Sequence, residues 1–155
     1  MSVCLFFDMD KDAEAYLTAH AVSGCEAVFL AQEFNDPKTI TLEQYKNADV
    51  ISIFPHSDSL KNDYLDYFPN LKLIATRSTG FNHIDLDYAK KRGIAVVNVP
   101  NYGEVTVAEF TMGTMLGLSR KIYKAKSQMK ANNVHMDDCI GIDLAGRTLG
   151  VIGTG

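Results

Sequence analysis

The first hundred residues alternate short apolar runs with segments of helical spacing, and this alternation restricts the possible folds more than any other feature. The runs are rich in Val, Ile, Leu or Phe and cover residues 3–7, 26–30, 50–54, 71–76 and 94–99. Mainly apolar runs of this length are typical of parallel strands buried on both faces. Helices are predicted between them, at residues 12–20, 42–46, 61–68 and 85–91. The predicted fold class is α/β, with a doubly wound parallel sheet in the flavodoxin-like strand order 2-1-3-4-5.

After Pro100 the pattern changes to that of one long amphipathic helix. Residues 104–130 contain no proline, and their apolar residues recur at spacings of three and four. Acidic residues stand early in this segment and basic residues late, which complements the helix dipole. Gly113 and Gly117 lie inside the segment, and we expect them to permit close packing against another backbone.

A predicted strand that runs into glycines ends the sequence. A polar connector at 132–143 is followed by residues 149–155, which read LGVIGTG. A Gly-x-Gly after a strand opens the dinucleotide-binding fingerprint, which also needs a third glycine, a helix N-terminus for the pyrophosphate and an acidic residue about 20 positions on. Those three features do not occur within the 155 residues. The expected division is a flavodoxin-like domain at 1–102, a connecting helix at 103–131 and the first strand of a dinucleotide-binding domain at 132–155.

Composition and charge exclude several other classes. Fifteen Lys and Arg against nineteen Asp and Glu give a net charge of −4, without the positive field that holds nucleic acid. No stretch approaches the ~20 apolar residues of a membrane span. Cys4, Cys25 and Cys139 are odd in number and widely spaced, which predicts neither a disulfide framework nor a metal site and indicates a reducing cytoplasm.

Four blocks carry the most specific pattern in the chain. They are residues 77–86 (RSTGFNHIDL), 93–103 (GIAVVNVPNYG), 106–109 (TVAE) and 149–155 (LGVIGTG). In this order and spacing they resemble the D-isomer-specific 2-hydroxyacid dehydrogenases, and the resemblance runs over nearly the whole chain. Members of that family are NAD-dependent oxidoreductases that transfer hydride between NAD and a 2-hydroxy or 2-oxo acid. They are about twice as long as this chain, which matches only their first half.

The resemblance implies roles for named residues. The backbone of Thr79 and Gly80 would hold the substrate carboxylate, and Phe54 and Tyr102 would border the cleft. Residues that would approach the NAD cofactor are Thr106, Gly153 and Gly155. The family's catalytic Arg, Glu and His all correspond to positions beyond residue 155, so we expect no catalytic residue, no activity and no tight NAD binding in this chain by itself. Family members commonly dimerise around the region of residues 104–130, which predicts a homodimer.

The residues themselves support part of this interpretation. A glycine in a loop at the carboxyl end of a parallel strand can let backbone N–H groups approach an anion, although Gly80 could also be an ordinary turn glycine. His83 is expected to be a packed or solvated loop residue, and His56 a residue that lines the cleft. Glu109 is expected to be a structural partner because no histidine pairs with it nearby.

The acidic residues after the first predicted strand bear on two other protein classes. Asp8 and Asp10 after an apolar strand imitate the nucleophile motif of haloacid-dehalogenase-type phosphatases, in which one aspartate attacks phosphorus and the next acts as an acid. The same acidic residues would repel a flavin phosphate, which excludes a true flavodoxin. A stand-alone flavodoxin-like module used for binding or dimerisation remains the alternative to a truncated dehydrogenase.

Overall fold

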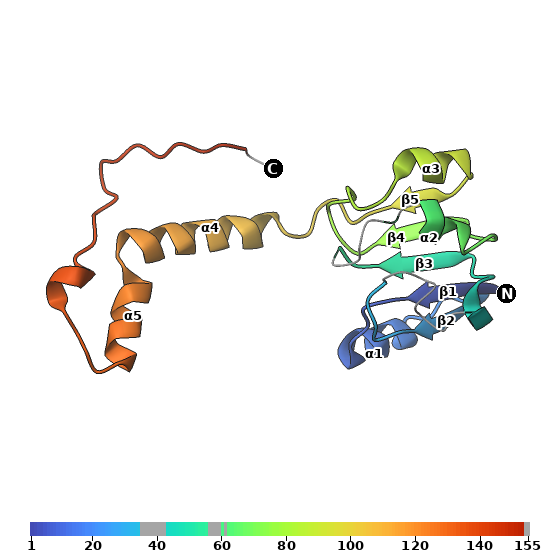
Figure 1. The fold of residues 1–155 in the computed structure, drawn as a ribbon, viewed down its shortest axis with the longest axis horizontal. Coiled ribbons are helices and arrows are strands. Elements are labelled where there is room, and N and C mark those ends of the chain that lie inside the picture. The colour runs from blue at the N-terminus through green and yellow to red at the C-terminus, as the bar shows by residue number, and fades with distance from the viewer. Residues whose placement is uncertain (35–42, 56–59, 61, 154–155) are drawn as a thin grey trace. The chain divides into compact units, whose positions relative to one another are not determined.

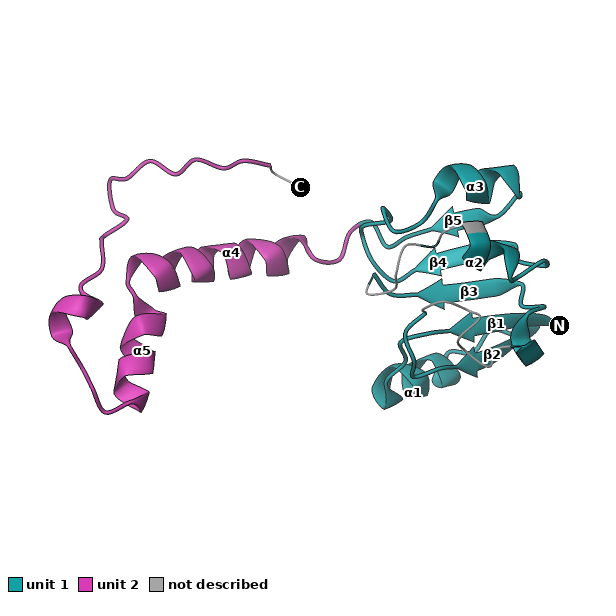
Figure 2. Cartoon of the chain, in the orientation of Figure 1, with its two compact units in different colours: residues 1–100 teal, residues 101–155 magenta. Residues whose placement is uncertain are grey.

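The computed structural model describes residues 1–34, 43–55, 60 and 62–153 of the chain. These residues form two compact units, at 1–100 and 101–155 (Figure 2). The first unit contains a sheet and its covering helices, and the second contains helices and an extended C-terminal segment. No helix among the described residues combines the length and the apolar character needed to cross a membrane.

The first unit is built on five parallel strands in the order β2-β1-β3-β4-β5 (Figure 1). The strands are β1 (Ser2–Phe6), β2 (Cys25–Phe29), β3 (Val50–Ile53), β4 (Leu73–Thr76) and β5 (Ala95–Val97). The register aligns apolar residues across the sheet, with Ile51 opposite both Leu5 and Ile74. The predicted sheet and strand order are confirmed.

Helices connect the strands as the spacing predicted. They are α1 (Lys11–Ala19), the 3-10 helix η1 (Glu43–Tyr45), α2 (Asn62–Asp66) and α3 (Leu86–Lys91). Asp10 caps α1 by accepting a hydrogen bond from the Ala13 amide at 2.7 Å, and Asp85 caps α3 in the same way. Because crossovers between parallel strands are right-handed, α1 covers one face of the sheet, and α2 and α3 cover the other.

The hydrophobic core lies on the sheet between these layers. The side chains of Leu5, Ile51 and Ile74 are fully buried. Phe7 and Phe34 pack edge to face, with ring centroids 4.8 Å apart. Polar groups lie beyond this core, at the amino ends and at the carboxyl ends of the strands.

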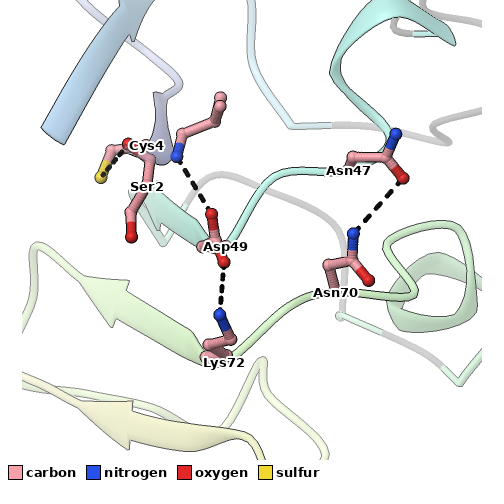
Figure 3. Close-up of polar contacts among 7 residues, drawn as sticks. Ser2, Cys4, Asn47, Asp49, Asn70 and Lys72 are labelled. Atoms are coloured by element: carbon pink, nitrogen blue, oxygen red, sulfur yellow. Dashed lines mark hydrogen bonds and ion pairs between the residues drawn. The ribbon is translucent and has the colours of Figure 1, made fainter.

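At the amino edge of the sheet, Asp49 joins three strands (Figure 3). Its carboxylate accepts hydrogen bonds from the Val3 amide at 3.1 Å and from the Lys72 ammonium at 2.7 Å. The ammonium of Lys72 is the main reason why the pKa of Asp49 lies below its usual range. Nearby, Asn70 donates to Asn47. The polar groups of this edge are directed toward one another.

The second unit contains α4 (Glu104–Ser119), α5 (Ile122–Lys130) and the 3-10 helix η2 (Met136–Cys139). The prediction of a single helix over 104–130 was therefore wrong. Lys121 takes a left-handed conformation, with φ of 53°. The Ile142 amide donates to the Ser119 carbonyl at 2.8 Å, which is the carbonyl that a continuing helix would offer to the Tyr123 amide. The connector at residue 142 therefore supplies the hydrogen bond that the next turn of the helix would have made.

One of the two glycines of α4 has a close neighbour within this unit. A Cβ on Gly117 would come within 2.6 Å of the Tyr123 ring, whereas nothing among the described residues lies within 4 Å of such an atom on Gly113. The expectation of a strand at the end of the sequence was wrong. No strand forms over the described residues 147–153. A strand needs a neighbour to satisfy its N–H and C=O groups, and this apolar segment pairs with no strand in the part of the chain that the structure describes.

Candidate functional site

The carboxyl ends of β1, β3 and β4 lie at one edge of the sheet. The connections from β1 and β3 leave toward opposite faces, which makes the gap between these two strands the topological switch point of the sheet. Crevices at such points, outside the carboxyl ends of the strands, are where open α/β sheets bind ligands. The residues that follow the three strands include Asp8, Phe54 and the loop at 77–84.

Arg77 connects the ends of these strands. Its guanidinium donates to the Phe7 carbonyl after β1 and, at 3.0 Å, to the hydroxyl of Ser52 in β3. The guanidinium carbon lies 6.0 Å from the ring centroid of Phe54. Burial lowers the pKa of Arg77, and the carboxylate of Asp8 opposes this shift. Arg77 is thus engaged with the strand ends, and the sequence prediction had named it only as part of a motif.

The loop after β4 has three consecutive peptide carbonyls held by hydrogen bonds from the protein. The Ser78 carbonyl accepts from the Val99 amide at 3.0 Å, and the Thr79 carbonyl accepts from the Asn98 side chain at 2.9 Å. The Gly80 carbonyl accepts from the Ser78 hydroxyl at 2.7 Å. All peptide bonds are trans, so each following N–H points away from the group that holds its carbonyl.

The N–H groups opposite these carbonyls belong to Thr79, Gly80 and Phe81. All three residues are exposed, and none of their N–H groups has an acceptor among the described residues. Successive backbone N–H groups that face outward form sites that bind anions. The geometry therefore suits a small carboxylate or another compact anion.

Gly80 is not required by the conformation of the loop. Its φ lies outside the left-handed region, and a Cβ built on it would meet nothing within 4 Å. The fold would therefore accept a side chain here, unlike at Gly93, where φ is +73°. Absence of a side chain at position 80 leaves the neighbouring N–H groups accessible to a ligand.

A row of polar side chains lies behind the loop, and sequence reasoning missed it. Thr76 and Ser78 are buried, with their hydroxyl oxygens 2.7 Å apart. The Nε2 atom of His83 lies 3.2 Å from the Thr76 hydroxyl. Burial lowers the pKa of His83, which favours the neutral ring. The alternation of the hydroxyl residues Thr76 and Ser78 at the end of an apolar strand was the available signal.

The other predicted site residues are distributed differently. Tyr102 and Thr106 lie in the second unit and are exposed. Glu109, expected to have a structural partner, is exposed in α4 and makes no ion pair within the described part of the chain. Asp10 caps α1, which is a sufficient structural reason for an acidic residue there. His56 and Gly155 lie outside the described residues.

The described residues of the glycine motif do not form a dinucleotide site. Gly153 has φ of +81°, but the described residues around it form neither a strand nor a helix N-terminus that could receive a pyrophosphate. In the part of the chain that the structure describes, no three His, Cys, Asp or Glu side chains converge to hold a metal ion.

Comparisons with known proteins agree with this arrangement. The family model "D-isomer specific 2-hydroxyacid dehydrogenase, catalytic domain" matches residues 4–140. A "2-hydroxyacid dehydrogenase homolog" of Zymomonas mobilis is 34% identical over 100% of this chain and 46% of its own length. An "aromatic 2-oxoacid reductase" of Clostridium sporogenes is 44% identical over 71% of this chain and 34% of its own length.

A solved structure shows the same likeness. The D-lactate dehydrogenase of Aquifex aeolicus, complexed with NAD and lactic acid, aligns with a TM-score of 0.83 and 35% identity. The alignment covers 98% of this chain and 44% of that one. This chain thus spans less than half the length of the relatives that it matches.

Proposed function

This chain belongs to the D-isomer-specific 2-hydroxyacid dehydrogenase family, and we propose that its loop after β4 holds the carboxylate of a small 2-oxo or 2-hydroxy acid. The backbone N–H groups of Thr79 and Gly80 make the contact, and that of Phe81 adds a third donor. One observation carries this proposal. The three consecutive carbonyls of residues 78–80 accept hydrogen bonds from the protein, whereas the N–H groups that follow them have no acceptor among the described residues.

Phe54 supplies an apolar wall in the proposed site. It follows β3 at the same edge of the sheet, and its ring lies against the Arg77 guanidinium. An apolar surface next to a carboxylate site suits the carbon chain of a 2-oxo acid. The roles of Tyr102 at the cleft border and of Thr106, Gly153 and Gly155 in contact with NAD are part of the same proposal and come from the family resemblance.

The test is a titration of the ¹⁵N-labelled chain with pyruvate, followed by amide chemical shifts. We expect the amides of Thr79, Gly80 and Phe81 to shift together with one dissociation constant. Pyruvamide has the same shape without the charge and should leave them unmoved. Absence of any shift with pyruvate, or equal shifts with both compounds, would contradict the proposal.

We further propose that these 155 residues alone neither reduce 2-oxo acids nor bind NAD usefully. The family reaction transfers hydride to or from NAD, and the described residues around Gly153 form no helix N-terminus for its pyrophosphate. Calorimetry should find no NAD binding, and a dissociation constant below roughly 100 μM, about −5.5 kcal/mol, would contradict this. Addition of a separately produced cofactor-binding half, followed by NADH oxidation with pyruvate, distinguishes a half-enzyme from a stand-alone module.

A homodimer through residues 104–130 is the proposed assembly, in a cytoplasmic setting that keeps the three cysteines free. The observation in favour is that α4 exposes large apolar side chains, including Val105, Phe110 and Leu118. Exposed apolar patches of this kind mark interaction sites, and two-fold dimers are the commonest oligomers. Light scattering should give twice the 17.1 kDa chain mass. Phe110→Glu should convert the dimer to monomer, and Thr18→Glu, at an exposed position of α1 outside this segment, should not.

A further inference from the structure

The three side chains behind the loop form a hydrogen-bond relay with a single direction. The Ser78 hydroxyl has one hydrogen, and it is donated to the Gly80 carbonyl at 2.7 Å. Thr76 must therefore donate the hydrogen that joins its hydroxyl to that of Ser78. Since the one hydrogen of Thr76 is then used, the contact at 3.2 Å requires His83 to donate from Nε2.

The two hydroxyls in the middle of the relay are shielded from water. Thr76 is 2% exposed and Ser78 is 3% exposed, so water has little access to replace a missing donor. The His83 backbone is held separately, because its carbonyl accepts from the Leu60 amide at 2.6 Å and the following residue pairs with Leu60 in a parallel bridge. The hydrogen bond from the His83 ring to Thr76 is therefore separate from the contacts that hold the His83 backbone.

We infer that His83 is a positioning residue, which orients the Gly80–Phe81 peptide through Thr76 and Ser78 and so preorganises the loop for a carboxylate. This inference rests on the proposed function for its ligand. Donation from Nε2 raises the donor strength of each hydroxyl in turn, because hydrogen bonds in a chain polarise one another. The Gly80 carbonyl is thereby held inward and the Phe81 N–H outward, which lowers the cost of ordering the loop on binding.

The test compares two His83 variants in the full 155-residue chain. His83→Phe keeps a ring but removes the donor, and His83→Gln keeps an N–H donor near the position of Nε2. Loss of one preorganising hydrogen bond should raise the dissociation constant for pyruvate about fivefold in His83→Phe, while His83→Gln should stay within about twofold. The control is His20→Phe, an exposed histidine of the first unit that lies outside this relay.

Spectroscopy separates positioning from mere packing. In the ligand-free chain, the ring nitrogens of His83 should report the Nε2–H tautomer. The carbonyl ¹³C of Gly80 and the amide ¹⁵N of Phe81 should move in His83→Phe and return in His83→Gln. Thr76→Val breaks the relay in its middle with little change in shape. It should move the same Gly80 and Phe81 signals, and it provides the test by itself if His83→Phe fails to fold.

Each outcome has a defined meaning. The Nδ1–H tautomer, or unchanged Gly80 and Phe81 shifts in both Thr76→Val and His83→Phe, would overturn the relay. Altered shifts with an unchanged dissociation constant would overturn the positioning role. If the wild-type chain binds no pyruvate, the proposed function fails, and the inference about the loop conformation then stands or falls on the ligand-free shifts alone.

Discussion

The two edges of the sheet use hydrogen bonds in opposite ways. At the amino edge, the Asp49 carboxylate accepts from Val3 and Lys72, and the Asp49 carbonyl accepts from the Lys72 amide at 2.8 Å (Figure 3). At the carboxyl edge, three loop carbonyls accept hydrogen bonds, and the N–H groups of the exposed residues Thr79, Gly80 and Phe81 have no acceptor among the described residues. The amino edge thus satisfies its polar groups internally, whereas the carboxyl edge leaves three exposed backbone N–H groups without an acceptor in the described part of the chain, as the proposed carboxylate site requires.

Removal of the Arg77 side chain should have the largest effect on stability. The guanidinium joins the ends of β1 and β3, and its loss leaves a buried carbonyl and hydroxyl without a partner. Arg77→Ala should therefore lower the free energy of unfolding by about 3 kcal/mol. Urea unfolding measures this, with the exposed Arg147→Ala as the matched control. A loss below about 1 kcal/mol would show that the carboxyl edge does not depend on Arg77.

Gly93 provides a purely structural counterpart to Gly80. It follows α3 and precedes β5 with φ of +73°, a conformation that costs a residue with a side chain about 1–2 kcal/mol. Gly93→Ala should lower stability by that amount and leave the dissociation constant for pyruvate unchanged. A change in pyruvate affinity in this variant would mean that binding simply follows stability, and the distinction between the edges would be lost.

The smallest expected effect is the pH dependence contributed by Asp49. Its pKa is lowered in the folded chain, chiefly by Lys72, so its contribution to stability is present above the unfolded pKa of about 3.9 and is lost as pH falls through the lower folded pKa. Asp49→Asn should therefore flatten the decrease of the urea midpoint below about pH 4. An equally steep decrease in the variant would exclude this role.

Strand order and core were predictable because their signals are local. Each buried strand is a short apolar run, and the alternation with helices defines the topology. The break at Lys121 was not predictable in this way, because the apolar spacing continues across it. It arises from the distant connector, in which the Ile142 amide takes the Ser119 carbonyl. The missing strand at the C-terminal end has a related cause, since an apolar run becomes a strand only beside a neighbour.

In the candidate site, too, some features are visible in the local sequence and others depend on distant residues. The family resemblance pointed to Thr79 and Gly80, and a glycine after a parallel strand is visible in the sequence. The reason why their N–H groups face outward lies in Asn98, Val99 and Ser78, and two of these belong to a segment nearly twenty residues further along the chain. His83 stood in the motif, but its role depends on the two hydroxyls that the fold places beside it.

The most direct test of the difference between the edges is the pair of values measured for Gly80→Val: the free energy of unfolding and the dissociation constant for pyruvate. The loop has open space and an ordinary φ at this position, so stability should change by less than about 0.5 kcal/mol. A side chain beside the outward N–H groups should weaken pyruvate binding at least about tenfold. Unchanged affinity with unchanged stability would show that no carboxylate approaches this loop.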